Sequence, residues 1–411
     1  MPPLIVTDSA YTFVPPYEGN LWPKVLSRFV LSQLRSRCEI TEVEIRNAEV
    51  LKPLLANKDG ILLAPNHCRM ADAMVLQSLS AELRQPFFVM ASSHLFRGSR
   101  LLKWALRRIG AFSVYREGVD RKALDTATGI LEHGKRPLVI FPEGALSHAN
   151  DRLNALMEGV SFIARSAARR VSKQEGSSRN VYVVPIAIRY LFTGDLHRTV
   201  GPMLTRIEER LTWRPDEDRT PVERLMRLGN ALLGLKETEF LGNPQTGAIN
   251  ERLDRLIDSL LTPLENEWLS GKTDPSVINR VKELRKAIVP GMIESDDNES
   301  LSPDEMERRW KQLENMSLAQ ALSLFPKEYV ASNPTPDRIL ETVERVAEAL
   351  SGEEQVHGPM RVILQIGEPM AVPAKRDRSA TTDPVLQHIE DQLVNMLAET
   401  APPAAEPWGG E

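Results

Sequence analysis

Several features that would narrow the interpretation of this 411-residue sequence are scarce or missing. Its two cysteines, Cys38 and Cys68, cannot supply a disulfide framework and are typical of a reducing compartment. The first residues lack the basic segment and the apolar run of a signal peptide. No apolar run reaches the roughly eighteen residues that a membrane span needs. We therefore expect a cytoplasmic protein without a transmembrane helix.

The net charge of −5 is too small to indicate a class of partner, but the charge is unevenly distributed. Acidic residues are in excess over residues 291–411, so residues 1–290 are net basic. A basic surface can lie on an anionic membrane or bind an acidic substrate. The middle of the chain has no strongly basic stripe, no nucleotide-binding loop and no metal-ligand cluster, so we expect no nucleic-acid partner.

Short apolar runs alternate with helical patterns over the first half of the chain. This order is typical of an α/β layer structure with a mostly parallel or mixed sheet. The expected strands are Ile61–Ala64, Pro86–Ala91, Phe112–Tyr115, Pro137–Phe141 and Val181–Ile188. The expected helices are Ala71–Leu83, Leu101–Ile109, Lys122–His133 and Leu153–Arg169.

The second half is helical until one late strand. No strand pattern is found between residues 198 and 350, and no internal repeat is recognised. An edge strand at Arg361–Ile366 and a helix at Pro384–Leu397 would then close the first domain. Helices are expected at Pro202–Trp213, Pro221–Leu241, Thr246–Leu269, Val277–Ile288, Pro303–Leu324 and Pro336–Leu350.

This order predicts an α/β domain with a large all-helical insertion before its last strand. The expected parts are a lead-in with a basic helix (1–44), the main domain (45–194), the insertion (195–357), the closing strand and helix (358–398) and a disordered tail (399–411). Residues 294–299 are expected to form a flexible acidic loop. The insertion could bind a protein partner or mediate oligomerisation.

Two stretches combine apolar and basic residues without acids. Leu21–Arg37 and Ala91–Ile109 could each lie in the interface of an anionic bilayer. The alternative is a pair of helices packed on the core with a solvated basic rim. Both interpretations remain open at this point.

The segment PNHCRMAD holds the first candidate catalytic residues, His67 and Asp72. It follows an expected strand, and sites in α/β sheets tend to lie at the carboxyl ends of strands. A carboxylate that accepts one imidazole N–H leaves the other ring nitrogen free to take a proton from a hydroxyl. Alternatively, Asp72 only caps its helix and His67 is an ordinary turn residue.

Three further blocks follow in order. GAFSVYR ends in Arg116, which is suited to binding a phosphate. The strand LVIF continues into Pro142-Glu143-Gly144, where glycine permits a close approach. VPIAI contains a proline, which in a strand indicates an edge or an irregularity.

Together these four blocks resemble the phospholipid/glycerol acyltransferase family of the lysophosphatidate type, over about residues 45–192 and 358–398. The resemblance implies a glycerolipid-acyltransferase-like mixed sheet flanked by helices. It implies His67 as general base and Asp72 as its orienting partner. Arg116 would contact the acceptor phosphate, and Glu143 and Gly144 would form the acceptor site. The donor would be acyl-CoA or acyl carrier protein, without a metal, a cofactor or a covalent acyl-enzyme at Cys68.

Two positions depart from the family pattern. Arg69 stands where the family often has serine, and Ala145-Leu146-Ser147 replaces Thr-Arg-Ser. The second change weakens the case for a phosphate-bearing acceptor, unless Arg69 supplies the missing charge. We therefore expect phospholipid synthesis on a lysolipid, best 1-acylglycerol-3-phosphate, by an enzyme peripheral on the inner face of the membrane. A different lipid acceptor and a catalytically silent lipid-binding or scaffold protein remain as alternatives.

Overall fold

A computed structural model shows an α/β protein whose mixed sheet is flanked by helices, which confirms this part of the predicted fold class. It describes residues 11–116, 118–174, 176, 178–292, 301–325, 329–353, 355–375 and 382–402. The chain divides into two compact units, described here separately. The sheet unit comprises Thr12–Thr193 and Gly358–Pro403, and the helical unit contains Gly194–His357. The predicted acidic loop 294–299 lies outside the described residues, as does most of the predicted disordered tail.

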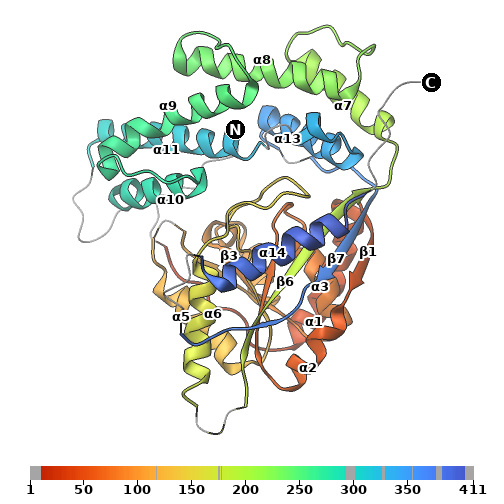
Figure 1. Cartoon of the computed structure of the whole chain (residues 1–411), viewed down its shortest axis with the longest axis vertical. Coiled ribbons are helices and arrows are strands. Elements are labelled where there is room, and N and C mark those ends of the chain that lie inside the picture. Colours follow the sequence, from red (N-terminus) through yellow and green to blue (C-terminus); the bar gives the residue numbers. More distant parts are fainter. Residues whose placement is uncertain are drawn as a thin grey trace. The chain divides into compact units, whose positions relative to one another are not determined.

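The sheet unit has eight strands in the order β1-β7-β6-β2-β5-β3-β4, with β8 also pairing with β6. Figure 1 labels β1, β7, β6 and β3 of this sheet. Neighbours from β6 to β4 are parallel, whereas β7 and β8 run antiparallel to β6. The strands are β1 Ile40–Arg46, β2 Gly60–Pro65, β3 Phe88–Ser92, β4 Ala111–Val114, β5 Leu138–Val139, β6 Val181–Phe192, β7 Met360–Ile366 and β8 Met370–Ala371. The carboxyl ends of β2, β5, β3 and β4 therefore meet at one edge of the sheet.

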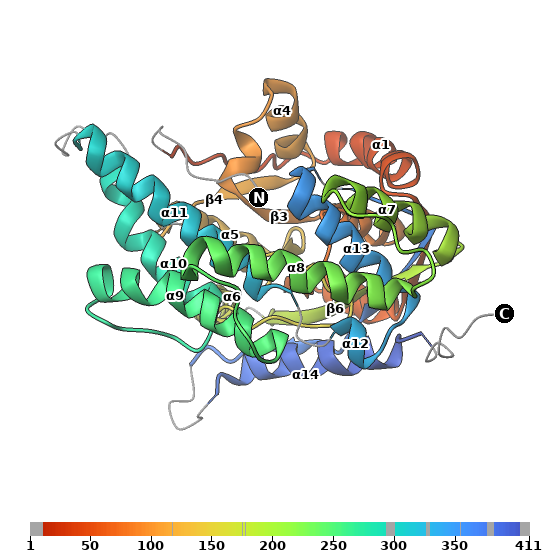
Figure 2. The same ribbon diagram turned by 90° about the horizontal axis from the view of Figure 1, so that it is seen from above.

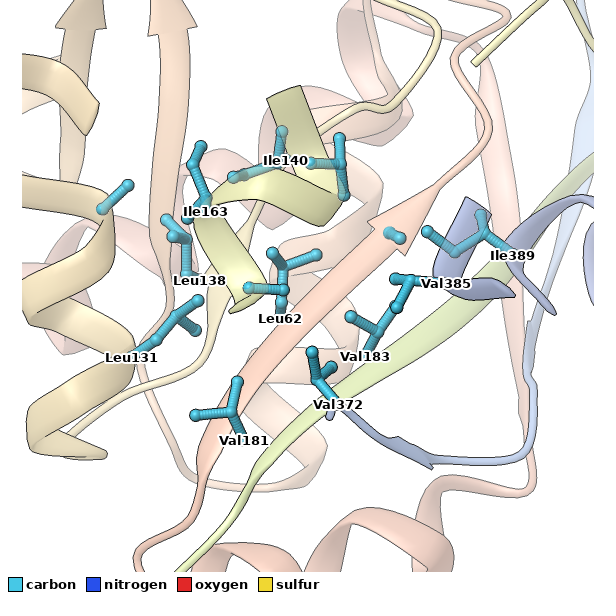
Figure 3. Packing of buried hydrophobic residues seen from close by; sticks show 14 of the residues in the cluster. Leu62, Leu131, Leu138, Ile140, Ile163, Val181, Val183, Val372, Val385 and Ile389 are labelled. Carbon is cyan, nitrogen blue, oxygen red and sulfur yellow. The ribbon is translucent and has the colours of Figure 1, made fainter. Parts of the chain in front are cut away.

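Helices cover both faces of this sheet. One face packs against α5 (Arg121–His133), α6 (Gly159–Val171) and α14 (Pro384–Glu399), and Figure 3 shows this core around Leu62, Leu138 and Val183. On the other face lie α1 (Leu21–Arg37) and α3 (Asp72–Glu82). Because both faces are covered, β2 is buried at every position and reads as a continuous apolar run. The remaining short elements are η1 Ala48–Val50, α2 Leu51–Ala56, η2 Ser93–Phe96 and α4 Arg100–Arg108.

Pro185 lies in the middle of β6, not at an edge of the sheet. On one side Pro185 is in register with Ala64 of β2. On the other side β7 ends at Ile366 and β8 begins at Met370, and the backbone N–H of Gly367 donates to the Pro185 carbonyl at 2.9 Å. The missing proline N–H thus falls where the antiparallel ladder is interrupted, which is the irregularity that a strand proline requires.

The helical unit contains α7 Leu196–Arg210, α8 Pro221–Leu241, α9 Ile249–Leu269, α10 Val277–Ile288, η3 Val289–Met292, α11 Pro303–Ser323, α12 Tyr329–Ser332 and α13 Pro336–Ser351. Most of the predicted bounds agree to within a few residues. Three of these helices begin with a Ser or Thr cap followed by proline: Thr220, Ser302 and Thr335 accept a hydrogen bond from the first turn.

A buried Glu–Arg ion pair joins two successive helices at three connections of the helical unit, which we call corners. The pairs are Glu208–Arg224, Glu237–Arg252 and Glu265–Arg280, separated by 16, 15 and 15 residues. At each corner the arginine is the fourth residue of its helix and bonds the glutamate through two nitrogens.

The arginines are spaced 28 residues apart along the chain. The expectation that the chain has no internal repeat was therefore wrong. The repeat is visible in the sequence, since ERLMRL at residues 223–228 recurs as ERLDRL at residues 251–256.

Several element boundaries differ from those predicted. Strand β1 was not predicted, because its partly exposed ITEVEIR pattern follows a basic helix without a turn signal. Helix α6 begins at Gly159, not at Leu153, because the backbone of 151–157 is bonded to the loop after β5. Helix α7 begins six residues before Pro202, capped by Asp195, and contains that proline. Strand β7 lies between β1 and β6, so it is not an edge strand.

Candidate active site

His67 and Asp72 meet at the carboxyl end of β2. The Nδ1 atom of His67 lies 2.8 Å from Oδ2 of Asp72, which is the first residue of α3. The Asp72 side chain has no exposed surface, whereas the His67 side chain is 21% exposed. Helix α3 has no side-chain cap, so the alternative that Asp72 merely caps its helix is wrong.

Asp72 also accepts hydrogen bonds from two backbone N–H groups and from a hydroxyl. The backbone N–H groups of Cys68 and Arg69 donate to Oδ2 at 2.8 and 3.0 Å. The hydroxyl of Tyr190 donates to Oδ1 at 2.7 Å. An ionised carboxylate only accepts, so Nδ1 of His67 carries the proton and Nε2 is the basic nitrogen.

Tyr190 is completely enclosed beside Asp72. Burial and, to a lesser degree, the negative charge of Asp72 raise its pKa well above the ordinary value, so the phenol stays protonated and donates. The guanidinium of Arg69 lies over the same ring, 5.4 Å from its centroid. Tyr190 was not among the predicted site residues. Its only signal in the sequence is that it continues the apolar strand VPIAI.

Two asparagines attach the site to β6 beyond the end of β2. The Asn66 side chain accepts from the N–H of Ile188 at 2.7 Å and donates to its carbonyl at 3.1 Å. Asn150 bonds the N–H and the carbonyl of Tyr190 in the same way. These amides continue the hydrogen-bond ladder where β2 has ended, and so fix Tyr190 relative to His67. Neither asparagine was predicted.

The block FPEG forms the support of His67. The ring of Phe141 stacks on the imidazole with centroids 3.9 Å apart. Glu143 accepts from the N–H of His67 at 2.7 Å and from the N–H of Asn154 at 2.9 Å. The N–H of Ser147 donates to the His67 carbonyl at 2.7 Å. The backbone of His67 is thus held on both sides by the loop after β5.

Glu143 is fully buried, and burial raises its pKa to about 8 despite the two backbone donors. Gly144 has φ +69°, and a Cβ there would lie 2.2 Å from the sulfur of Met157, so this position requires glycine. Both carboxylate oxygens of Glu143 are engaged by backbone groups. The predicted contacts of Glu143 and Gly144 with an acceptor stay predictions.

The other predicted residues lie at the same edge of the sheet. Arg116 is exposed, two residues after β4. Strand β4 is three strands away from β2, which corresponds to about 14 Å. Its predicted phosphate contact stays a prediction. Cys68 is buried with its sulfur 3.8 Å from Asp72 Oδ1. Among the residues that the structure describes, no cluster of His, Cys, Asp and Glu could hold a metal ion.

The fold and the site define an α/β domain with a buried carboxylate orienting a partly exposed histidine. Residues 42–189, which contain the whole site except Tyr190, match the family described as Acyltransferase. This match supports the resemblance of that segment to the glycerolipid acyltransferases. No curated protein gives a significant match to the chain. No helix in the described ranges is both long and apolar enough to cross a bilayer.

Proposed function

We propose that the protein transfers a fatty acyl group from a thioester to the hydroxyl of a lysolipid, with 1-acylglycerol-3-phosphate as the preferred acceptor. The observation that carries this proposal is the 2.8 Å contact between His67 Nδ1 and the buried Asp72 carboxylate. The family match over residues 42–189 supports acyl transfer as the reaction class. The donor would be acyl-CoA or acyl carrier protein, and no cofactor is required.

His67 would act as general base and then as general acid. Nε2 takes the proton of the acceptor hydroxyl while the hydroxyl oxygen attacks the thioester carbonyl carbon. The C–S bond then breaks, and the imidazolium returns the proton to the leaving thiolate. The products are one ester and one thiol. Asp72 stabilises the imidazolium, and its bonds to Tyr190 and to the backbone keep it in place.

Arg69 and Arg116 would bind the acceptor phosphate from opposite sides. Arg69 is half-buried beside the His67–Asp72 pair, and Arg116 is exposed at the end of β4. Ala145 and Leu146 stand where the family motif has a small residue and an arginine. The positive charge that binds a phosphate must therefore come from other residues. Arg69→Ala should raise the KM for the acceptor, whereas an unchanged KM would exclude Arg69 from the acceptor site.

We also propose that residues 195–357 are an insertion into the acyltransferase fold, which the segment 358–398 closes. The antiparallel pairing of β7 with β6 supports this proposal, since the chain leaves the sheet after β6 and returns next to it.

The test is an assay of labelled acyl-CoA and acyl carrier protein against a panel of lysolipids. His67→Ala and Asp72→Ala should each lower the rate by about 10²-fold or more. His133→Ala, on an exposed end of α5, is the matched histidine control and should retain the wild-type rate. The acceptor turned over fastest would separate 1-acylglycerol-3-phosphate from another lipid. Absence of turnover with every pair would favour the catalytically silent alternative.

A further inference from the structure

Helix α1 has two apolar rows, and only one of them faces the sheet unit. Leu34 is buried in the unit, and Leu26 and Val30 on the same row are half-buried. The second row is exposed: Leu21, Val25 and Phe29 are 68%, 52% and 62% exposed. Their four-residue spacing places them along one side of the helix. Packing on the core explains the first row but not the second.

Helix α4 carries a similar apolar surface. None of its residues is buried. Leu101 is 73% exposed, Leu102 47% and Trp104 37%. Helix α4 thus packs on its own unit with no buried residue, and it exposes two leucines and a tryptophan. Such a surface is suited to contact with an apolar phase outside the protein.

Helices α1 and α4 lie next to each other (Figure 2). The rings of Trp22 and Trp104 meet edge to face with centroids 4.9 Å apart. The guanidinium of Arg108 lies within 6 Å of both ring centroids. The segment before α1 is tied to α4 as well, because the N–H of Tyr17 donates to the carbonyl of Arg107 at 3.2 Å. The exposed apolar side chains therefore keep a fixed arrangement.

The charge of this surface has one sign. The chain has no Asp or Glu between Glu18 and Glu39, nor between Glu82 and Glu117. On α1, on α4 and just before α4, the exposed basic side chains are Lys24, Arg28, Arg35, Arg37, Arg97, Arg100, Lys103 and Arg107. Apolar side chains surrounded by basic ones match the surface of an anionic bilayer. The apolar side chains can enter the acyl-chain region, and the basic side chains can contact the phosphate head groups above it.

We propose that α1 and α4 together dock the protein on an anionic phospholipid bilayer, with Leu21, Val25, Phe29, Leu101 and Leu102 entering the interface. The bases around them contact lipid phosphates. This docking does not depend on acyl transfer, since it can be measured as binding alone.

The test is sedimentation of the full chain with vesicles of phosphatidylcholine alone or mixed with phosphatidylglycerol. The wild-type protein should bind the mixed vesicles, more weakly as salt rises, and bind phosphatidylcholine far less. Phe29→Ser combined with Leu101→Ser should weaken binding about tenfold or more. Arg28→Ser combined with Lys103→Ser should weaken it by roughly fivefold for each base removed.

Matched controls come from exposed apolar residues elsewhere. Phe162 on α6 is 58% exposed and Leu235 on α8 is 61% exposed, so Phe162→Ser and Leu235→Ser should bind like the wild type. Circular dichroism of each variant checks that it is folded. Equal binding by the wild type and the Phe29/Leu101 variant would overturn the proposal, as would equal binding to neutral and anionic vesicles. Failure to bind either kind of vesicle would also overturn it and leave a protein partner as the occupant.

Discussion

The carboxylate of Asp72 accepts hydrogen bonds from an imidazole, from backbone N–H groups and from a phenol hydroxyl. His67, the backbone after it and Tyr190 all donate to it, and no solvent reaches it. In such an environment each donor stabilises the negative charge by about 1.5 to 3 kcal/mol. The position of the Asp72 carboxylate beside His67 therefore depends on several other donors.

Tyr190→Phe should lower kcat about tenfold with little change in KM for either substrate. Without the hydroxyl, the Asp72 carboxylate is less stabilised and holds the imidazolium proton more tightly. The acidic limb of the kcat/KM profile should therefore move to higher pH. Tyr182→Phe, on the same strand, serves as the control. A Tyr190→Phe enzyme with an unshifted profile would remove Tyr190 from the positioning of Asp72.

Glu143 should make the free energy of unfolding depend on pH. Its pKa is about 8 in the folded protein against 4.5 for an ordinary glutamate. Between these values the folded chain holds a proton that the unfolded chain releases, so stability falls as pH rises from about 4.5 to 8 and levels off above. The loss should be on the order of a few kcal/mol, since one pKa unit corresponds to about 1.4 kcal/mol.

Glu143→Gln removes this titration. Its stability is lower overall, because an amide cannot accept from both backbone N–H groups, but its slope over this pH range should be flatter than that of the wild type. Urea unfolding at several pH values measures the difference, with the exposed Glu314→Gln as control. Parallel curves for wild type and Glu143→Gln would contradict the raised pKa.

The candidate site could be predicted from residues with distinctive chemistry. The order of the blocks around His67, Asp72 and Glu143 was sufficient to bring them together at one edge of the sheet. It could not assign Tyr190, Asn66 or Asn150, because their roles arise from β6 extending past the end of β2. An asparagine that completes a strand ladder and one in an ordinary turn look the same in a sequence.

At the scale of elements, the corners of the helical unit depend on buried ion pairs. Arg252→Ala leaves the Glu237 carboxylate buried without its partner, which should destabilise the unit by about 3 to 5 kcal/mol. Lys236→Ala, which breaks an exposed pair with Glu239 on α8, should cost less than about 1 kcal/mol. Urea unfolding followed by circular dichroism compares the two. Equal effects would contradict the importance of burial at the corner.

The boundaries of these helices were largely predictable, because polar caps and prolines mark their starts. Thr220-Pro221 and Thr335-Pro336 are two examples. Elements without such signals were missed: β1 exposes charged side chains, β8 has two residues, and α12 has four. Short elements depend on tertiary pairing rather than on local propensity, so periodicity alone cannot find them.

At the scale of the whole molecule, the sheet unit depends on a segment that arrives late in the chain. Strand β7 fills the space between β1 and β6, and α14 is tied to α6 by two hydrogen bonds between Arg165 and Asp383. The place of β7 inside the sheet could not be predicted, since strand order is set by pairing between distant segments.

A chain that ends at residue 357 should therefore fail to fold its sheet unit. Without β7 and α14, β1 loses its only described neighbour and the apolar face under α14 is exposed. Soluble yield and thermal unfolding measure the outcome, and a chain that ends at residue 402 is the control. A shorter chain whose thermal transition includes loss of β-sheet circular dichroism, like that of the control, would show that residues 12–193 fold without residues 358–402.

The 28-residue spacing of Arg224, Arg252 and Arg280 has a consequence for how the helical unit can change in length. Arg224 and Arg252 each precede the glutamate of the next corner by 13 residues, so removing residues 225–252 would join Arg224 to Glu265 at that same separation. In the resulting helix, Arg224 and Glu265 would have the same angular separation around the helix axis as Arg224 and Glu237 have now. Each would also keep its own ion-pair partner. Gene segments encoding 28 residues could therefore be lost or duplicated in register, and the helical unit would shorten or lengthen by whole corners.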